Sequence, residues 1–195
     1  MNDWLDLFTG TTWQEFGAAG ARITGFRRRM RKTVARVQPD DILLCYMTGV
    51  MRWVGALRVI APSNDTQEIW SVAEFPVRLE VEPLVLLDAE RGVPMDELEG
   101  KVEFFEGRDD RGKFKGFVRR SPNLFRRPQD GEVVLQLLRE AEENPTVRPV
   151  DPKKYGRRPL LQDQTELFRL FSDNPSFKKW LADTIFWVTY DDSAA

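Results

Sequence analysis

The chain contains no histidine and a single cysteine among its 195 residues. Without histidine, Ser-His-Asp triads, Cys-His pairs and zinc sites of mixed cysteine and histidine ligands cannot be assembled. The lone cysteine, Cys45, excludes an internal disulfide and fits a reducing compartment. These two absences remove much of the nucleophilic and metal chemistry on which an enzymatic function would rest.

Long apolar runs are also missing. No run approaches the roughly 18 residues of a membrane span. The first residues, MNDWLDLF, lack the basic and apolar regions of a signal peptide. We therefore expect a cytoplasmic protein with no membrane partner and no cofactor. At 42% hydrophobic residues, the chain is long enough for one well-cored domain with an added subdomain.

The chain has no overall excess of positive charge. Its formal net charge is −2, which argues against a protein that coats nucleic acid by bulk electrostatics. The charge is segregated, however: basic residues cluster at 22–36 and 113–127, and acidic residues at 88–106 and 140–143. This pattern permits one basic face on a near-neutral protein. The alternative interpretation is a set of ordinary solvated helix and loop faces.

One stretch combines a strand pattern with a prominent aromatic residue. Apolar and charged residues alternate from Phe75 to Glu82, the period-2 pattern of a half-buried strand. Trp70 precedes this strand and follows a polar stretch, 62–68, that is typical of a loop. A tryptophan in this position is well placed to stack on a flat ligand. The alternative is a ring folded back over the end of the sheet.

The remaining periodicity predicts an α+β chain with a small, mixed, barrel-like sheet. The Thr12-x-x-Glu15 spacing predicts a capping box at the start of the first helix. Pro83 predicts a bulge or edge position in a strand that runs to Leu87. Predicted strands cover 4–8, 42–47, 52–60, 75–87, 101–105 and 114–118, and predicted helices begin near residue 12 and cover 27–37, 95–98 and 129–143.

The composition changes after Pro145. We predict a domain at 1–145, a proline-rich basic linker at 146–162 and a C-terminal helical extension at 163–195. The helix predicted at 176–190 has a wide apolar face. This face can dock on the barrel, pair with a second copy or bind an effector protein, and it consists of Phe177, Trp180, Leu181, Thr184, Ile185 and Val188.

Several stretches, in this order and spacing, resemble the EVE family, a branch of the PUA-like fold related to YTH domains. They are WLDLFTGTTWQEF, GFRRRMRKTVARVQPDDILLCYMTG, RWVGALRV, IWSVAEFPVRLEV and Arg119-Arg120-Ser121 before a helix. The resemblance implies a PUA-like/YTH-like mixed β-barrel flanked by helices. It also implies a non-catalytic reader of modified bases. YTH relatives hold N6-methyladenine in an aromatic cage, EVE domains are linked with modified cytosines, and many bacterial members are associated with defence against foreign DNA.

The resemblance implies a set of base-binding residues. Phe26 takes the place of a first cage aromatic, where the family more often has Trp, and Trp70 takes the second place, followed by Ser71. Trp53 is either a third wall or a buried strand residue. We expect Trp13 in the core, because it lies in the first turn of a capped helix. Three further residues are candidates for hydrogen bonds to the base edge: Thr24, Tyr46 and Thr48.

Reading a base by enclosure requires flipping it out of a duplex, at a cost of a few kcal/mol. Stacking on an aromatic ring returns about 1–3 kcal/mol, whereas burying one methyl group gives only about 0.8 kcal/mol. Discrimination therefore also needs polar groups that the wrong base leaves unpaired. Backbone phosphates must be held by cations, which position the strand without specifying it. The candidates are Arg27, Arg28, Arg31, Lys32, Arg119 and Arg120.

We thus expect a reader of methylated or hydroxymethylated cytosine, or of N6-methyladenine. DNA is favoured over RNA as its target, in a restriction or defence setting. One alternative is an RNA- or tRNA-binding PUA-like module. Another is a metal-dependent nuclease that uses Glu99 and Lys101, with Asp88 and Asp96 upstream, although Gly100 suggests a turn where that chemistry needs a strand. A third is an interaction module that works through the Trp180 face.

Overall fold

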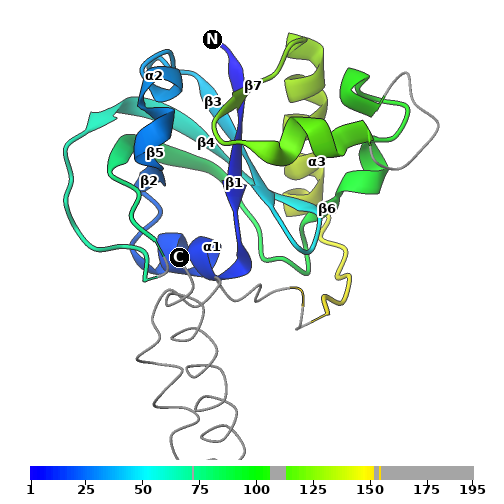
Figure 1. Ribbon diagram of the computed structural model, residues 1–195. Coiled ribbons are helices and arrows are strands. Elements are labelled where there is room, and N and C mark those ends of the chain that lie inside the picture. The colour runs from blue at the N-terminus through cyan, green and yellow to red at the C-terminus, as the bar shows by residue number, and fades with distance from the viewer. Residues whose placement is uncertain (72, 106–112, 152–153, 155–195) are drawn as a thin grey trace, which may run out of the picture. The chain divides into compact units, whose positions relative to one another are not determined.

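In the computed structural model, the described residues are 1–71, 73–105, 113–151 and 154, and their strands form one curved, seven-stranded sheet (Figure 1). The order is β2-β5-β4-β3-β1-β7, and β6 pairs with β4. β1 and β3 are parallel and the other pairs are antiparallel. The strands are β1 (Asp3–Phe8), β2 (Ile23–Phe26), β3 (Ile42–Met47), β4 (Arg52–Ser63), β5 (Val77–Leu86), β6 (Val93–Pro94) and β7 (Asn123–Leu124).

The centre of the sheet is covered on both faces, and β3 shows this most clearly. All six residues of ILLCYM are buried, and the side chains alternate between two core clusters. Cys45 belongs to the cluster that includes Trp13 of α1 and Val34 of α2, on what we call the inner face. Tyr46 belongs to the cluster that includes Val134 of α3, on the outer face. This double covering explains why β3 is an unbroken apolar run.

The helical segments are divided between these two faces. α1 (Gly10–Ala18) and α2 (Arg31–Val34), preceded by the 3₁₀ turn η1 (Arg28–Met30), supply inner-face core residues. α3 (Pro128–Glu143) and the 3₁₀ turns η2 (Met95–Leu98), η3 (Glu103–Phe105) and η4 (Lys113–Arg119) supply outer-face core residues. In the part of the chain that the structure describes, no helix has the length and apolar character needed to cross a membrane.

Much of the predicted secondary structure is confirmed. The α+β fold class is right, and β1, β3 and β4 lie where the sequence predicted strands. The hairpin through Gly49 is present, with this glycine at φ +89°. The bulge predicted at Pro83 also occurs, because the register of β4 on β5 shifts between Ala56, which pairs with Val85, and Leu57, which pairs with Pro83.

The capping box at Thr12 is wrong by one turn. The N-cap is Thr9, whose extended backbone continues directly from β1, and Thr12 is the third helical residue. The Thr9 hydroxyl accepts from the Thr12 amide at 3.2 Å, and the Thr12 hydroxyl accepts from the Thr9 amide at 2.9 Å. Thr12 therefore occupies the N3 position of the capping box that the prediction assigned to Glu15. The Glu15 carboxylate makes a tertiary contact instead.

The basic helix predicted at 27–37 is also shorter than expected, because only η1 and α2 form within it. Like charges four residues apart, such as Arg28 and Lys32, disfavour a longer helix. The segment is held by packing instead, since Val34 and Val37 are buried in the inner-face core.

The strands predicted at 101–105 and 114–118 are 3₁₀ turns, η3 and η4. Their phenylalanines pack on one another: Phe104 stacks on Phe117 with ring centroids 4.7 Å apart, and Phe105 lies 5.3 Å from Phe114. A strand would point Phe104 and Phe105 to opposite faces. Ring packing over the outer face has therefore overridden the strand propensity of these residues.

The first part of the predicted linker lies on the domain. The Arg52 guanidinium donates to the carbonyls of Arg148 (2.8 Å) and Pro149 (3.3 Å), and the Arg148 amide donates to the Glu90 carbonyl at 2.8 Å. The boundaries at 145 and 162 stay predictions. The turn predicted at 106–112 and the C-terminal extension, with its Phe177, Trp180, Leu181 and Ile185 face, lie outside the described residues.

Candidate nucleic-acid interface

Trp70 packs against Gly25 on the outer face of β2. Its ring atoms Cη2 and Cζ3 would be 2.7 Å from a Cβ atom placed on Gly25, and the Cβ atom of Phe75 would be equally close. Any side chain at this position would collide with the indole, so glycine is what allows the ring to rest on bare backbone. In this position Trp70 is only 6% exposed.

A few directed contacts hold the Trp70 ring. The indole Nε1 donates to the Thr12 carbonyl of α1 at 3.3 Å. Phe75 meets the ring edge-on, with centroids 5.1 Å apart and planes at 78°. The guanidinium of Arg78 lies over the ring, 5.6 Å from its centroid, and also pairs with Asp65 at 2.6 Å. One aromatic ring and one cation thus flank the indole, an arrangement that also suits a flat ligand.

Ser71 ties the same segment to α1. Its amide donates to one oxygen of Glu15 at 3.2 Å, and its hydroxyl makes a shorter hydrogen bond to that oxygen. The second oxygen, Oε2, is buried and has no hydrogen-bond partner among the described residues. A buried acceptor without a partner costs free energy that a bound donor would recover.

Phe26 and Thr24 lie on the opposite, inner face of β2. Phe26 is 2% exposed in the inner-face core, and Thr24 is fully buried, with its hydroxyl donating to Asp6 at 2.7 Å. Side chains alternate along a strand, so Gly25 faces Trp70 while its two neighbours face inward. Phe26 and Trp70 are therefore not brought together in this structure, and the aromatic ring that contacts Trp70 is Phe75.

Trp53 and Tyr46 belong to the outer-face core. Trp53 is 0% and Tyr46 2% exposed, with ring centroids 5.2 Å apart. This placement matches the interpretation of Trp53 as a buried strand residue. Burial, with a smaller contribution from Asp96, raises the pKa of the Tyr46 phenol above its ordinary value. Thr48 is half-buried and its hydroxyl donates to the Phe8 carbonyl at 3.1 Å. Contact of any of these with a base stays a prediction.

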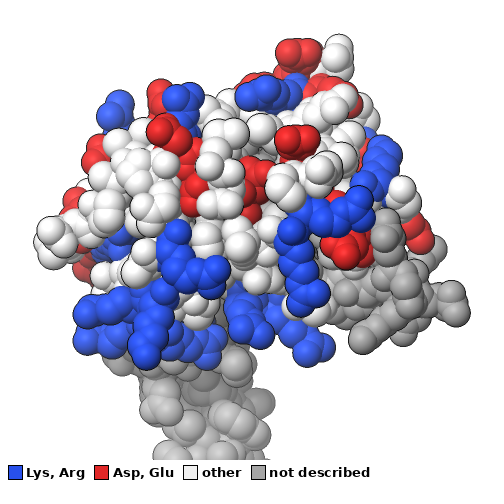
Figure 2. Space-filling view, turned by 90° about the horizontal axis from the view of Figure 1, so that it is seen from above, with Lys and Arg blue, Asp and Glu red and all other residues white. Residues whose placement is uncertain are grey.

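The predicted phosphate contacts lie on the surface. Figure 2 shows lysine and arginine side chains gathered along the lower margin of the view, with acidic side chains mainly above it. The basic segment that follows Phe26 is anchored by buried Val34 and by Arg36, whose guanidinium lies 5.8 Å from the Trp4 ring centroid. All six predicted phosphate-binding residues are exposed: Arg27, Arg28, Arg31, Lys32, Arg119 and Arg120.

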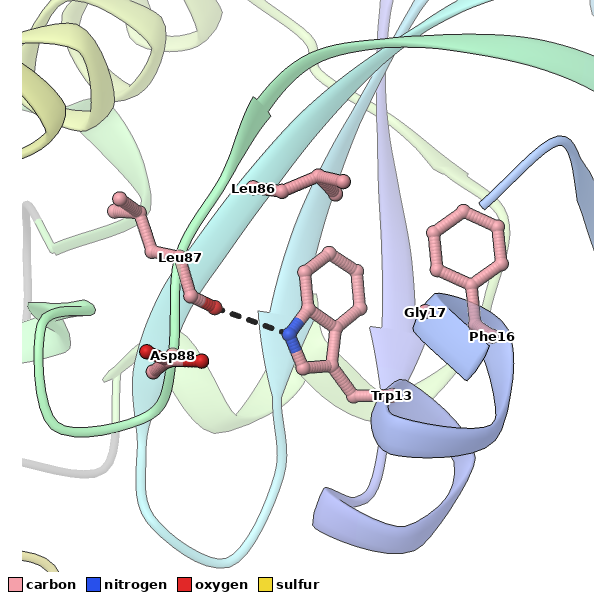
Figure 3. Close-up of a pocket in the computed structure, with 6 residues that line it drawn as sticks. All are labelled: Trp13, Phe16, Gly17, Leu86, Leu87 and Asp88. Carbon is pink, nitrogen blue, oxygen red and sulfur yellow. Dashed lines mark hydrogen bonds between the residues drawn. The ribbon is translucent and has the colours of Figure 1, made fainter. Parts of the chain in front are cut away.

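A hollow of about 180 Å³ opens between α1 and the end of β5 (Figure 3). Its lining includes Trp13, Phe16 and Leu86, and the Trp13 indole donates to the Leu87 carbonyl at 3.0 Å. Trp13 is 8% exposed, because Phe8 and Phe16 pack against its ring at 5.0 and 5.5 Å. The ring faces are occupied by core contacts, so the hollow offers little area for stacking.

The residues of the nuclease alternative lie in a turn. Glu99 follows η2, and Gly100 has φ +75°, which agrees with the turn that the glycine suggested. Within residues 1–71, 73–105, 113–151 and 154, no three histidine, cysteine or acidic side chains form a group that could hold a metal ion.

The sequence analysis missed four residues around Trp70. Gly25 was part of the resemblance, but its need to be a glycine appears only with the indole above it. Phe75 and Arg78 were noted as alternating residues of a strand, and Glu15 was taken for a helix cap. The spacing of Trp70, Phe75 and Arg78 at i, i+5 and i+8 follows no helical or strand period, so no pattern would have grouped them.

The chain matches no family model and no curated protein. It does match solved structures. The Mmi1 YTH domain in complex with RNA shares 13% identity, covers 76% of this chain and 84% of that chain, and has a TM-score of 0.51. The YTH domain of the Zygosaccharomyces rouxii MRB1 protein, in complex with N6-methyladenosine RNA, shares 12% identity, with 70% and 86% covered and a TM-score of 0.51. Protein Atu2648 from Agrobacterium tumefaciens shares 18% identity, with 77% and 100% covered and a TM-score of 0.45. The first two similarities show that the described domain has a YTH-like fold.

Proposed function

We propose that this domain is a non-catalytic nucleic-acid reader that binds a modified base, flipped out of its strand, on the outer face of β2. The observation that carries the proposal is the Trp70 ring, which lies on Gly25 with an aromatic ring and a guanidinium around it. The exposed basic segment begins two residues further along the chain, at Arg27. A stacking platform and phosphate contacts thus adjoin one another.

The base takes the place of Arg78 over the indole. Stacking on an aromatic ring is worth about 1–3 kcal/mol and does not depend on the base. Arg78 is paired with Asp65, and this ion pair gives the guanidinium a partner at the rim when the base displaces it from the ring. Phe75 at the ring edge keeps the indole oriented.

The polar groups beside the ring select among bases by their exocyclic amine, which the plain and modified forms share, and the modification itself contributes about 0.8 kcal/mol per buried methyl group. The unpartnered Oε2 of Glu15 accepts an N–H from the edge of the base, as carboxylates do from the exocyclic amine of cytosine. N6-methyladenine retains one exocyclic N–H, and cytosines modified at C5 retain both. A base without that donor leaves the carboxylate oxygen unpaired, which rejects it more strongly than a missing methyl group does.

The sequence resemblance to EVE domains favours modified DNA, in a restriction or defence setting. RNA is the second candidate, and the Mmi1 and MRB1 structures favour it, because those domains are in complex with RNA and with N6-methyladenosine RNA. Matched DNA and RNA oligonucleotides that carry the same modified base, in direct competition, decide between them.

The test is a binding panel of single-stranded oligonucleotides that contain N6-methyladenine, 5-methylcytosine, 5-hydroxymethylcytosine or no modification. The wild-type protein is expected to prefer one modified base. Trp70→Ala is expected to lose about 5- to 150-fold of that affinity, the equivalent of one stacked base, and Trp70→Phe is expected to retain part of it. Equal binding of modified and plain strands by the wild type, or magnesium-dependent cleavage of any strand, would refute the proposal.

A further inference from the structure

A buried carboxylate joins the two ends of the curved sheet. Asp6 lies in the middle of β1, is 2% exposed and shares the inner face with Trp4 and Phe8. Two hydroxyls donate to it, from Thr24 at 2.7 Å and from Ser121 at 2.6 Å. No lysine or arginine among the described residues pairs with it. Burial raises the pKa of Asp6 to about 6, against the lowering effect of the two hydroxyls. A charge held this deep without a cation costs stability, so its position calls for an explanation.

The two hydroxyls come from elements that the backbone ladder does not join to one another. β2 is an edge strand paired with β5, at the opposite end of the sheet order from β1. The Thr24 hydrogen bond therefore ties that edge to β1 through side chains. Ser121 is bound to β1 twice, because its hydroxyl also accepts from the Leu7 amide at 3.1 Å.

Each hydroxyl belongs to a residue that adjoins a basic segment in the sequence. Thr24 precedes Arg27 by three residues, a chain length of at most about 11 Å. Ser121 directly follows Arg120, and Arg27, Arg28, Arg119 and Arg120 are all exposed. One carboxylate thus links two pairs of arginines that lie more than ninety positions apart in the sequence.

We propose that Asp6 is a positioning residue, which uses Thr24 and Ser121 to hold the basic segments 27–32 and 119–120 at one fixed separation, so that both contact the same nucleic-acid backbone. The inference rests on the proposed nucleic-acid function and deepens it. Hydrogen bonds to an ionised carboxylate are about twice as strong as neutral ones, which favours Asp over an uncharged residue in this place. The buried charge is retained because it fixes the geometry of the two segments.

The first arm of the test measures how affinity for a plain oligonucleotide depends on salt. Each phosphate contact contributes about 0.7 (single strand) to 0.9 (duplex) to the slope of log K against log salt. Arg119→Ala with Arg120→Ala is expected to lower the slope by about 1.4–1.8. Ser121→Ala alone is expected to give a similar fall, and the triple variant no further fall. Val134→Ala, which removes a buried side chain of α3 from the outer-face core and alters neither Asp6 nor its two hydroxyl partners, is the stability control and should leave the slope unchanged.

The second arm needs no nucleic acid. Spin labels on Arg28→Cys and Arg120→Cys report the distance between the segments, and buried Cys45 stays unlabelled. Ser121→Ala and Thr24→Val are expected to broaden the distance distribution, while Thr24→Ser and Val134→Ala keep it narrow.

An unchanged distribution in Ser121→Ala, or an unchanged salt slope in that variant when the arginine variants do lower it, would overturn the inference. If the wild type bound oligonucleotides with no salt dependence, the proposed function itself would fail. The distance measurements separate that failure from a failure of the Asp6 bridge.

Discussion

The two faces of β2 are almost equally hidden from solvent, but they are covered in different ways. On the inner face, Phe26 is 2% exposed and packs in a core built from the sheet, α1 and α2. On the outer face, Trp70 is 6% exposed and belongs to the connection between β4 and β5. That connection is held by directed contacts to Thr12 and Glu15. The exposed fraction therefore does not distinguish the core ring, Phe26, from the ring that we propose binds a base, Trp70; the covering element does.

The substitution with the largest expected effect tests the packing on the inner face of β2. Phe26→Ala should lower the free energy of unfolding by about 3–5 kcal/mol, because it leaves a cavity in the core. Denaturant unfolding measures this loss. Phe26→Leu keeps most of the volume and removes the ring, so it should remain folded and retain the preference for a modified base. A folded Phe26→Leu variant that lost this preference would place Phe26 in the base pocket and break the comparison.

The next effect concerns the charge that Thr24 holds on the inner face. The pKa of Asp6 is about 6 in the folded protein, against an ordinary value of 3.8, because of burial. The folded state therefore binds a proton between pH 6 and 4 that the unfolded chain does not. The stability that this proton contributes is fully present below about pH 4 and is lost as the pH rises through about 6, by about 3 kcal/mol for a shift of this size.

Asp6→Asn should remove that pH dependence and raise the free energy of unfolding at pH 8, as measured by urea titrations at pH 4.5, 6 and 8. The side-chain amide that this substitution introduces can still form hydrogen bonds with both hydroxyls. Asp3 is the control for the remaining dependence. Its pKa is also raised to about 6, by burial and by Glu132 and Asp41, but Asp3 is only half-buried and contributes less. A stability profile of Asp6→Asn identical to that of the wild type would contradict the assignment.

A smaller effect tests the outer face. Gly25→Ala puts a methyl group where the Trp70 ring now lies, and overpacking of this kind costs about 1–3 kcal/mol. The cost should disappear in a Trp70→Ala background, because the obstacle is then gone. A double-mutant cycle by chemical unfolding measures this coupling. Additive effects of the two substitutions would mean that the ring does not rest on Gly25 in solution.

The smallest effect on folding is expected at the surface beyond β2. Arg27→Ala with Arg28→Ala should change the free energy of unfolding by no more than about 0.5 kcal/mol each. Affinity for modified and plain strands should fall by the same factor, since phosphate contacts carry no base information. Fluorescence titrations at several salt concentrations measure this. A loss of affinity confined to the modified strand would mean that these arginines contact the base and not the phosphates.

Local pattern was sufficient for much of the fold. The apolar run of β3, the alternation of β5 and the amphipathic repeat of α3 each predicted the right element, because their periods reflect which faces are buried. The phenylalanines of η3 and η4 gave a wrong strand prediction, because a buried face was again inferred from their spacing. Their spacing resembles a strand, but they cover another element instead of pairing in the sheet.

The candidate site was predictable in part. Trp70, Ser71 and the exposed arginines were identified from the sequence and its resemblance to EVE domains. Phe26 was paired with Trp70 because the resemblance implies a cage aromatic at each of these places, yet strand alternation turns Phe26 inward and Gly25 outward. The structure alone shows the contacts of Glu15, Phe75 and Asp6, because these contacts join segments that are distant in the sequence.

The sequence by itself determined which residues of each strand face the same way, because alternation and apolar period are local properties of the backbone. It also determined the absence of histidine chemistry and the segregation of charge. Tertiary structure alone decided what covers each face: the Trp70 indole over Gly25, and the hydroxyls of Thr24 and Ser121 on Asp6. These contacts join residues 18 to 115 positions apart, and the path of the connecting chain that brings them together is set by packing across the whole domain.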